Sequence, residues 1–266
     1  MTLQRINSGR GHWYKIDGQR VDGVTTLIRD GLPKPALMYW SARTVAEYVA
    51  DNLDVVAGMA GMDRESIVAA LKEVPWTLRD AAAAKGTEVH TYAERLARGE
   101  EVDVPEHIAG YVESAVTFLD DYQVETIQVE AAVGSRRWRY AGTADLIAAI
   151  TLPDGRRCRA VLDYKTSASG VWPDVSLQLA AYRNAEVYLD AGGRERPMSE
   201  LDLSETAYVV WLRSDGYDVY PVQVGEHVFK TFRHMAYVAR RTRKDGPMAG
   251  WLGSALPPVA REEITR

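Results

Sequence analysis

Two strand-like segments joined by a tight turn constrain the fold of this chain most strongly. They are RRWRYAGTADLIAAI at 136–150 and RCRAVLDYKTS at 157–167, and the turn between them carries Pro-Asp-Gly at 153–155. Proline and glycine supply the backbone angles that a tight reversal needs. A hairpin closed by this loop places Asp145 directly opposite Asp163. The turn therefore predicts both an antiparallel strand pair and its register.

This register brings two carboxylates together. Facing residues of an antiparallel pair have Cβ atoms about 4.5 to 5.5 Å apart, and like charges at that distance repel. Two close carboxylates either share a proton or need a cation between them. Lys165 follows Asp163 by two residues, so the two side chains share one face of the strand. A divalent metal ion is the economical explanation, because a solvated salt bridge between Asp163 and Lys165 leaves Asp145 unexplained.

A helical pattern follows at 173–190, and one of its apolar positions is polar. The residues expected on the apolar face are Val175, Ala181, Tyr182, Ala185 and Leu189. Gln178 falls in the middle of that face, one turn before Tyr182. A buried amide without partners costs roughly 1 to 3 kcal/mol. Gln178 is therefore expected to contact either a backbone group or the polar cluster on the Asp163 strand.

A second helical pattern, at 77–98, carries a histidine at the edge of its apolar stripe. The stripe consists of Leu78, Ala82, Val89, Ala93 and Leu96. His90 at its edge is either a structural hydrogen-bonding residue or a ligand. Gly86 precedes it by one turn, and glycine inside a helix costs about 1 kcal/mol relative to alanine, which suggests a close approach to the backbone there. His90 and Glu94 form an alternative local metal pair, with no evident third ligand.

The whole-chain properties favour one cytoplasmic globular domain. The chain has 266 residues, of which 46% are hydrophobic and 26% charged, without internal repeats or a Pro/Gly/Ser-rich linker. Its single cysteine, Cys158, excludes an intramolecular disulfide and cannot alone hold an iron-sulfur cluster. No apolar run reaches the length of a signal peptide core or a membrane span. The net charge of -5 argues mildly against non-specific binding to a polyanion, but it does not decide the partner.

The order of the expected elements indicates an α/β fold, more closely a mixed α+β arrangement with helices packed on a central sheet. Helices are expected at about 33–52, 64–73, 77–98, 105–121, 173–190 and 225–244. Strands are expected at about 127–135, 136–150 and 157–167, followed by a hairpin at 206–224. The part up to about residue 122 is therefore predicted to be helical.

Several short motifs, each weak alone, occur together in a characteristic order. They are GTEVH with His90, AGTADLI with Asp145, VLDYKTS with Asp163 and Lys165, and QLAAY with Gln178 and Tyr182. This ordered set resembles the PD-(D/E)XK nucleases of the RecB-like exonuclease group, and the chain looks like a phage-type relative of the CRISPR-associated members. The match covers about 86–190, and the N-terminal segments VTTLI and PKPAL are similar to such phage proteins less specifically.

The resemblance implies a restriction-endonuclease-like core at about 86–245 and a role for each motif residue. Asp145 and Asp163 would bind one or two Mg²⁺ or Mn²⁺ ions, with His90 and the backbone carbonyl of Tyr164 as further ligands. Lys165 would position or help deprotonate the attacking water and offset negative charge. In the same family, the pair Gln178 and Tyr182 would orient the site. Glu130 occupies a position where relatives often carry an acid, although a solvated strand charge explains it equally well.

DNA is the partner that the resemblance implies, and cations are needed to contact its phosphates. The candidates are Arg136, Arg137, Arg139, Arg241 and Lys244. Basic residues at the end of the last helix are also explained by the helix dipole. Many CRISPR-associated relatives carry four cysteines for an iron-sulfur cluster, which this chain lacks because it has only Cys158. We therefore expect no cluster here.

These expectations converge on a metal-dependent DNA exonuclease. It would act on DNA with a free end in phage recombination, repair or processing, beside recombination or replication proteins and in the cytoplasm of an infected bacterium. A structure-specific or restriction-type endonuclease of the same fold is the alternative within enzymes. A catalytically silent DNA-binding subunit is the alternative of another class, although the intact Asp145, Asp163 and Lys165 argue against it.

Overall fold

The computed structural model describes residues 2–9 and 11–256. Its strands are β1 Leu3–Ser8, β2 Gly11–Ile16, β3 Gln19–Gly23, β4 Glu125–Ser135, β5 Tyr140–Thr151, β6 Arg157–Lys165, β7 Val187–Leu189, β8 Glu195–Pro197, β9 Thr206–Arg213 and β10 Gly216–Gln223. Its α-helices are α1 Val24–Gly31, α2 Pro35–Asp51, α3 Leu53–Gly58, α4 Arg64–Ala97, α5 Ala109–Asp121, α6 Val175–Arg183 and α7 Glu226–Thr242. This is the predicted mixed α/β class.

The sheet branches at β5, and the branch positions the site. One edge of β5 pairs antiparallel with β4 over most of its length. The other edge pairs with β3 at Tyr140 and Ala141, and then with β6 from Leu146 to Thr151. The sheet continues from β6 through β9 to β10, and from β4 through β7 to β8. Residues 142–145 of β5 therefore lie in a fork, where no strand pairs with that edge.

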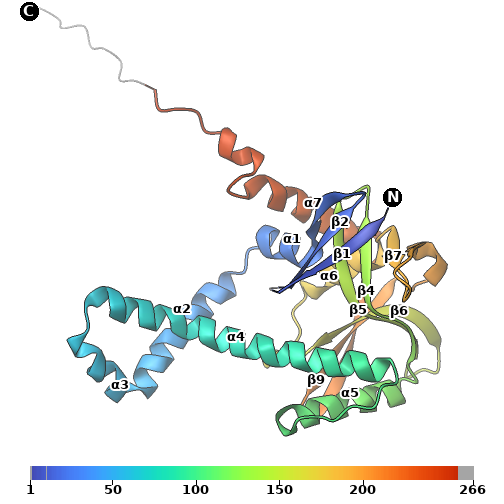
Figure 1. Ribbon diagram of the computed structural model, residues 1–266, viewed down its shortest axis with the longest axis horizontal. Coiled ribbons are helices and arrows are strands. Elements are labelled where there is room, and N and C mark those ends of the chain that lie inside the picture. Colours follow the sequence, from blue (N-terminus) through green and yellow to red (C-terminus); the bar gives the residue numbers. More distant parts are fainter. Residues whose placement is uncertain (1, 10, 257–266) are drawn as a thin grey trace, which may run out of the picture.

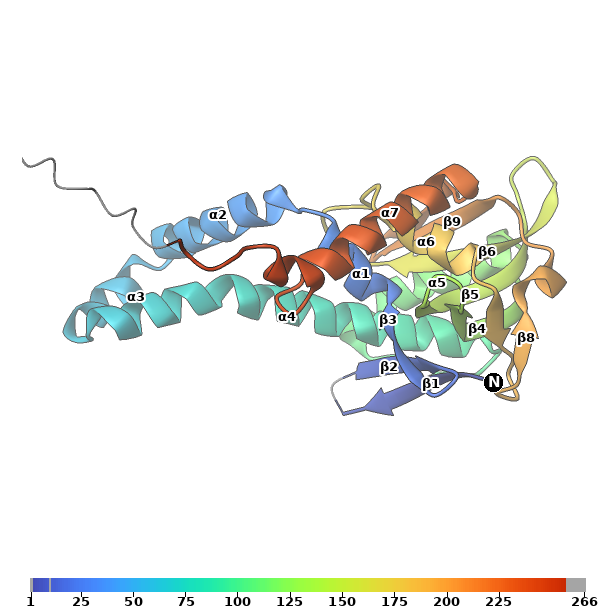
Figure 2. The same ribbon diagram turned by 90° about the horizontal axis from the view of Figure 1, so that it is seen from above.

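Helices cover both faces of the sheet (Figures 1 and 2). On one face, α1, α6 and α7 bury a core that includes Leu27, Leu179 and Phe232, each 0% exposed. On the other face, α4 and α5 bury a core around Phe118 and Leu146. Burying apolar surface stabilises by roughly 25 cal/mol per Å², so the two cores fix β5 and β6 from both sides.

Two expected helix boundaries are wrong. The patterns at 64–73 and 77–98 belong to one helix, α4, which continues through Pro75. Figure 2 shows that α2, α3 and the first half of α4 extend away from the sheet as an arm. Leu78 and Ala82 lie on that arm and are exposed, so they do not belong to an apolar stripe against the core. Periodicity alone cannot tell whether a helix has a surface to pack against.

The N-terminal part also differs from the expected helical architecture, because it begins with three strands. The meander β1–β2–β3 packs a small core of its own, which includes Leu3, Tyr14 and Ile16, against β4 and β5. Only two residue pairs join β3 to β5, at Asp22 and Gly23. Such short strands carry a weak pattern in the sequence. None of the helices in the described part of the chain is both long and apolar enough to cross a membrane.

Candidate functional site

The predicted hairpin register is confirmed. The β5–β6 ladder runs from Thr151 opposite Arg157 to Leu146 opposite Leu162, and the turn closes through Gly155, whose φ is +82°. One step beyond the last ladder pair, the two strands separate at the fork, while the other edge of β6 pairs with β9. The next residue on each strand is an aspartate, Asp145 on β5 and Asp163 on β6. At the fork, the Asp145 carboxylate accepts a hydrogen bond from the backbone N–H group of Tyr164 on β6.

Asp163 is the centre of the site and is 1% exposed. Its Oδ1 accepts a hydrogen bond of 2.8 Å from Nε2 of Gln178 on α6. Its Oδ2 forms a close ion pair with the ammonium group of Lys165. A buried carboxylate without a cationic partner is strongly destabilising. The ion pair with Lys165 therefore offsets the cost of burying the Asp163 carboxylate.

Asp145 faces Asp163 from β5 and is held by the backbone of the facing strand. The N–H group of Tyr164 donates to Oδ2 of Asp145 at 2.9 Å. Nδ1 of His90, on α4, lies 3.5 Å from the same oxygen. Burial, and then the charge of Asp163, raise the pKa of Asp145 well above its usual value. The charge of Asp163 thus acts directly on Asp145, in agreement with the predicted proximity of the two carboxylates.

The neighbouring cation and imidazole are shifted in opposite senses. Burial alone would lower the pKa of Lys165, but the Asp163 and Asp145 carboxylates raise it overall. Burial lowers the pKa of His90, and the charge of Asp163 opposes this only in part. At neutral pH Lys165 is therefore a cation, while His90 is a neutral imidazole, the form that can donate electrons to a metal ion.

Gln178 reaches the site because α6 packs directly over the fork. Besides Asp163, its Nε2 contacts the hydroxyl of Tyr182 one turn later, at 3.3 Å. Gly142 on β5 makes room for Tyr182, since a Cβ atom there would overlap the tyrosine ring. The expected length of this helix is wrong: α6 ends at Arg183, and Leu189 belongs to strand β7. Of the two partners expected for Gln178, a backbone group or the polar cluster on the Asp163 strand, the structure has the second.

The close approach predicted at Gly86 is also found. A Cβ atom at Gly86 would lie 3.0 Å from Oγ1 of Thr166, which follows Lys165 at the end of β6. The glycine lets α4 pass closely over the end of this strand. Because α4 packs closely on the end of β6 at Gly86, His90, one turn later, lies beside Asp145. His90 therefore lies at the site, as predicted.

Glu130 lies opposite the fork on β4, in the left-handed region at φ +51°. Its carboxylate forms an ion pair with Arg5 on β1 and a hydrogen bond with the carboxyl group of Glu94. A hydrogen bond between two carboxyl groups requires one of them to be protonated. Burial, and then the charge of Glu130, raise the pKa of Glu94 to about 7. The carboxyl group of Glu94 therefore interacts with Glu130. This interaction does not favour the alternative metal pair of Glu94 with His90.

Replacing Glu94 with glutamine should remove a pH dependence of stability. Because the pKa of Glu94 rises from 4.5 to about 7 on folding, its contribution is complete below about pH 4.5 and is lost as the pH rises through about 7. Since Glu94 is only half-buried and partly screened by solvent, we expect a gain of roughly 1 kcal/mol for Glu94→Gln at pH 8. Urea unfolding at pH 5 and pH 8 measures this. Glu73→Gln, an exposed change on the same helix, is the control, and identical pH profiles for the two variants would contradict the assignment.

The five DNA-contact candidates differ in their surroundings. Arg136 is occupied by ion pairs with Glu195 and Asp17, so it has a structural role. Arg137 and Arg139 are exposed and form no ion pair with any described residue. Arg241 stacks on the ring of Tyr237, and Lys244 is exposed beyond the end of α7. Arg137, Arg139 and Lys244 are therefore the exposed members of this set.

The residue types at the fork fit a hard divalent cation. Over residues 2–9 and 11–256, no group of three or more His, Cys, Asp and Glu side chains is arranged to hold a metal ion. Mg²⁺, however, is usually bound through only one or two carboxylates, with water and substrate phosphates completing its shell. The carboxylates of Asp163, which is ion-paired with Lys165, and of the facing Asp145 are oxygen donors of that kind. His90 and Tyr164 lie beside them.

The sequence was also compared with known proteins. No model of a known protein family matches the chain, and no curated protein is significantly similar to it.

Proposed function

We propose that the chain is a metal-dependent deoxyribonuclease that hydrolyses phosphodiester bonds at the fork between β5 and β6. The observation that supports this best is the pair of facing aspartates, Asp145 and Asp163, buried beside Lys165. Lys165 offsets the charge of Asp163 alone, so ionisation of the buried Asp145 lowers stability unless a second cation joins the cluster. A cluster kept at that cost is typical of a functional site.

Two carboxylates suit Mg²⁺ or Mn²⁺, because these ions prefer oxygen ligands. Asp145 and Asp163 would hold the ion, with His90 and the Tyr164 carbonyl as further candidates. When bound, the ion would lower the pKa of a water molecule and neutralise charge on the phosphate. The order of the motifs, which is similar to that of PD-(D/E)XK nucleases, favours the same assignment.

Each of the other residues at the fork has a separate task in this proposal. Lys165, a cation at neutral pH, would neutralise charge that builds up on the phosphate oxygens. Its raised pKa favours this role over that of a general base. Gln178 fixes the rotation of the Asp163 carboxylate through its 2.8 Å hydrogen bond. Tyr182, packed against Gly142, supports Gln178 from behind.

The test is incubation of the protein with linear, nicked and circular DNA in the presence of Mg²⁺ or Mn²⁺. We expect degradation of linear DNA and no reaction when a chelator is present. Cleavage of closed circles would favour the endonuclease of the same fold over the exonuclease. If no DNA is cut with either metal, the proposed activity is wrong, and the catalytically silent DNA-binding subunit becomes the better hypothesis.

A further inference from the structure

A basic cleft lies next to the fork and has no role in the function proposed above. Its volume is about 780 Å³, which is within the range of ligand-binding sites. Its walls are the β2–β3 hairpin, the start of α1, the β4–β5 loop and the end of α7. The first of these walls was not expected from the sequence. The cleft therefore exists only because the N-terminal meander packs beside β5.

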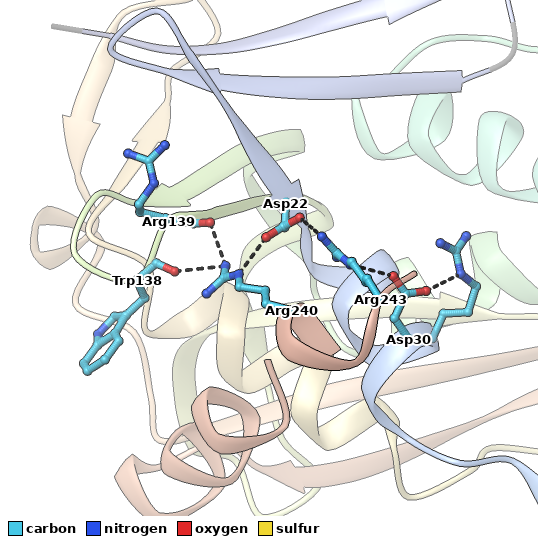
Figure 3. A network of polar contacts seen from close by, with 7 residues as sticks. Asp22, Asp30, Trp138, Arg139, Arg240 and Arg243 are labelled. Atoms are coloured by element: carbon cyan, nitrogen blue, oxygen red, sulfur yellow. Dashed lines mark hydrogen bonds and ion pairs between the residues drawn. The ribbon is translucent and has the colours of Figure 1, made fainter. Parts of the chain in front are cut away.

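The cleft concentrates positive charge on an acidic protein. Five arginines line it, against a single carboxylate, Asp22, although the whole chain has a net charge of -5. Asp22 is shared by Arg240 and Arg243, each at 2.7 Å (Figure 3). The other three lining arginines are Arg20, Arg137 and Arg139. Like charges gathered in this way repel, so folding alone does not account for them.

The three remaining arginines are available to a ligand. All of them are exposed, and none forms an ion pair with a carboxylate of the described residues. Figure 3 shows the guanidinium group of Arg139 pointing away from the network around Asp22. In the wall of the same cleft, Nη2 of Arg243 is buried without a hydrogen-bond partner. The cleft thus presents donors that lack acceptors.

The start of α1 adds backbone donors to this wall. Gly23, Thr25 and Thr26 line the cleft, and Gly23 is the N-cap residue of α1. No side chain caps this helix, and its first turn contains no acidic residue. An uncapped helix N-terminus carries a partial positive charge and free N–H groups, which favour anions such as phosphate. The VTTLI segment, which begins α1, therefore contributes backbone N–H donors to the cleft.

Two tryptophans in the lining favour nucleic acid over a small anion. Trp13 and Trp138 are half-buried, and arginines stack on both: Arg20 lies 5.2 Å from the Trp13 ring and Arg137 lies 4.9 Å from the Trp138 ring. Aromatic rings and guanidinium planes are the surfaces on which unpaired bases stack. The bases of a duplex are already stacked on one another, so only a single strand can use these surfaces.

The cleft is connected to the catalytic fork through one hydrogen bond. Tyr14 lines the cleft, and its hydroxyl group lies 2.7 Å from Oγ1 of Thr143 on β5. Thr143 precedes Asp145 by two residues, which is roughly 7 Å along a strand. A strand held in the cleft would thus be close to the two aspartates.

We propose that this cleft binds a single-stranded segment of nucleic acid and directs it to the fork. Arg20, Arg137, Arg139 and the N-terminus of α1 contact the phosphates, while Trp13 and Trp138 stack on bases. This inference rests on the proposed nuclease function, and it adds the substrate form and the residues that hold it.

Binding can be measured apart from cleavage by using Lys165→Ala as the background, so that the bound strand is not consumed. Fluorescence anisotropy of a labelled oligothymidylate gives its affinity. In that background, the double variant Arg137→Ala/Arg139→Ala should bind roughly tenfold or more weakly at low salt, and the slope of log affinity against log salt should fall by roughly 1.4. The control is Arg43→Ala/Arg79→Ala, which removes the same charge from exposed arginines that have local carboxylate partners.

Stacking is tested separately at Trp13. Loss of one stacked base should weaken binding by about 5- to 150-fold in Trp13→Ala, whereas Trp13→Phe should retain most of the affinity. The same strand presented as a blunt duplex should bind more weakly than the free strand. Circular dichroism of each variant confirms that it is folded.

Several outcomes would overturn the cleft assignment. They are equal affinity for duplex and single strand, unchanged binding by the Arg137→Ala/Arg139→Ala variant, no oligothymidylate binding at all, or thymidine monophosphate binding as tightly as the oligonucleotide. If the wild type cuts DNA while the double variant binds and cuts like the control, the cleft assignment fails and the nuclease stands. If single strands bind through the cleft but no DNA is cut, the nuclease fails and the cleft stands.

Discussion

Replacing Lys165 with alanine should lower the rate of DNA cleavage by about 10²- to 10³-fold, the loss expected when one electrostatic group is removed from a transition state. The ammonium group is held beside the buried Asp163 carboxylate and is charged at neutral pH. The measurement is the initial rate of degradation of linear DNA at saturating Mg²⁺ or Mn²⁺. Lys72→Ala, an exposed change on the arm of α4, should leave the rate unchanged.

A loss of stability could imitate this loss of activity, because Lys165→Ala leaves the Asp163 carboxylate buried without its ion pair. Breaking such a pair costs about 3 to 5 kcal/mol. The double variant Asp163→Asn/Lys165→Ala removes both charges together, so it should regain much of the stability while remaining inactive. If the rate of Lys165→Ala returns to that of the wild type at a temperature where this single variant is fully folded, Lys165 has a structural role only. Thermal unfolding, followed by circular dichroism, distinguishes the two results.

Asp145→Asn should make the protein more stable without metal and insensitive to metal. Because folding raises the pKa of Asp145, the contribution of its carboxyl group to stability is complete below about pH 3.8 and is lost as the pH rises through the folded-state pKa. Above about pH 3.8 the wild type must therefore either take up a proton at Asp145 on folding or bury its charge, and the asparagine removes this cost. The variant should melt at a higher temperature than the wild type in the presence of a chelator.

Addition of Mg²⁺ or Mn²⁺ should reverse this order. An ion present at 100 times its dissociation constant stabilises the folded wild type by about 2.7 kcal/mol. Asp145→Asn should show little of this shift, whereas the exposed control Asp103→Asn should show all of it. Melting curves with and without metal require no DNA substrate, so they test the metal site independently of cleavage. An equal metal-induced shift in Asp145→Asn and wild type would exclude Asp145 as a ligand.

The features of the site that could be predicted from the sequence are those that local geometry determines. The turn at 153–155 fixes the register of β5 and β6, so the facing of Asp145 and Asp163 follows from counting residues. The polar Gln178 in an apolar face had to turn towards polar partners, since an unpaired amide is costly to bury. Gly86 likewise indicated a close contact, which Thr166 provides. In each case a short-range rule leaves one arrangement of low energy.

What was missed depends on contacts between distant segments. The strands β1–β3 are short and gain their stability by packing against β4 and β5, a partner that the local pattern does not reveal. Arg136 was a candidate for DNA contact, yet it pairs with Glu195, which is 59 residues away in the chain. The contact between Glu94 and Glu130 joins α4 to β4. Spacing within one element carries no information on such partners.

The hairpin and the two facing carboxylates were thus predictable from the sequence, because a tight turn and the two-residue period of a strand determine which side chains meet. Only the tertiary structure decided that the strands separate at Asp145, since β3 and β6 share one edge of β5. It also decided which arginines retain a free charge, because Asp22 and Glu195 reach their partners from remote segments. Ion pairs form wherever folding brings opposite charges together, and that depends on the packing of the whole chain.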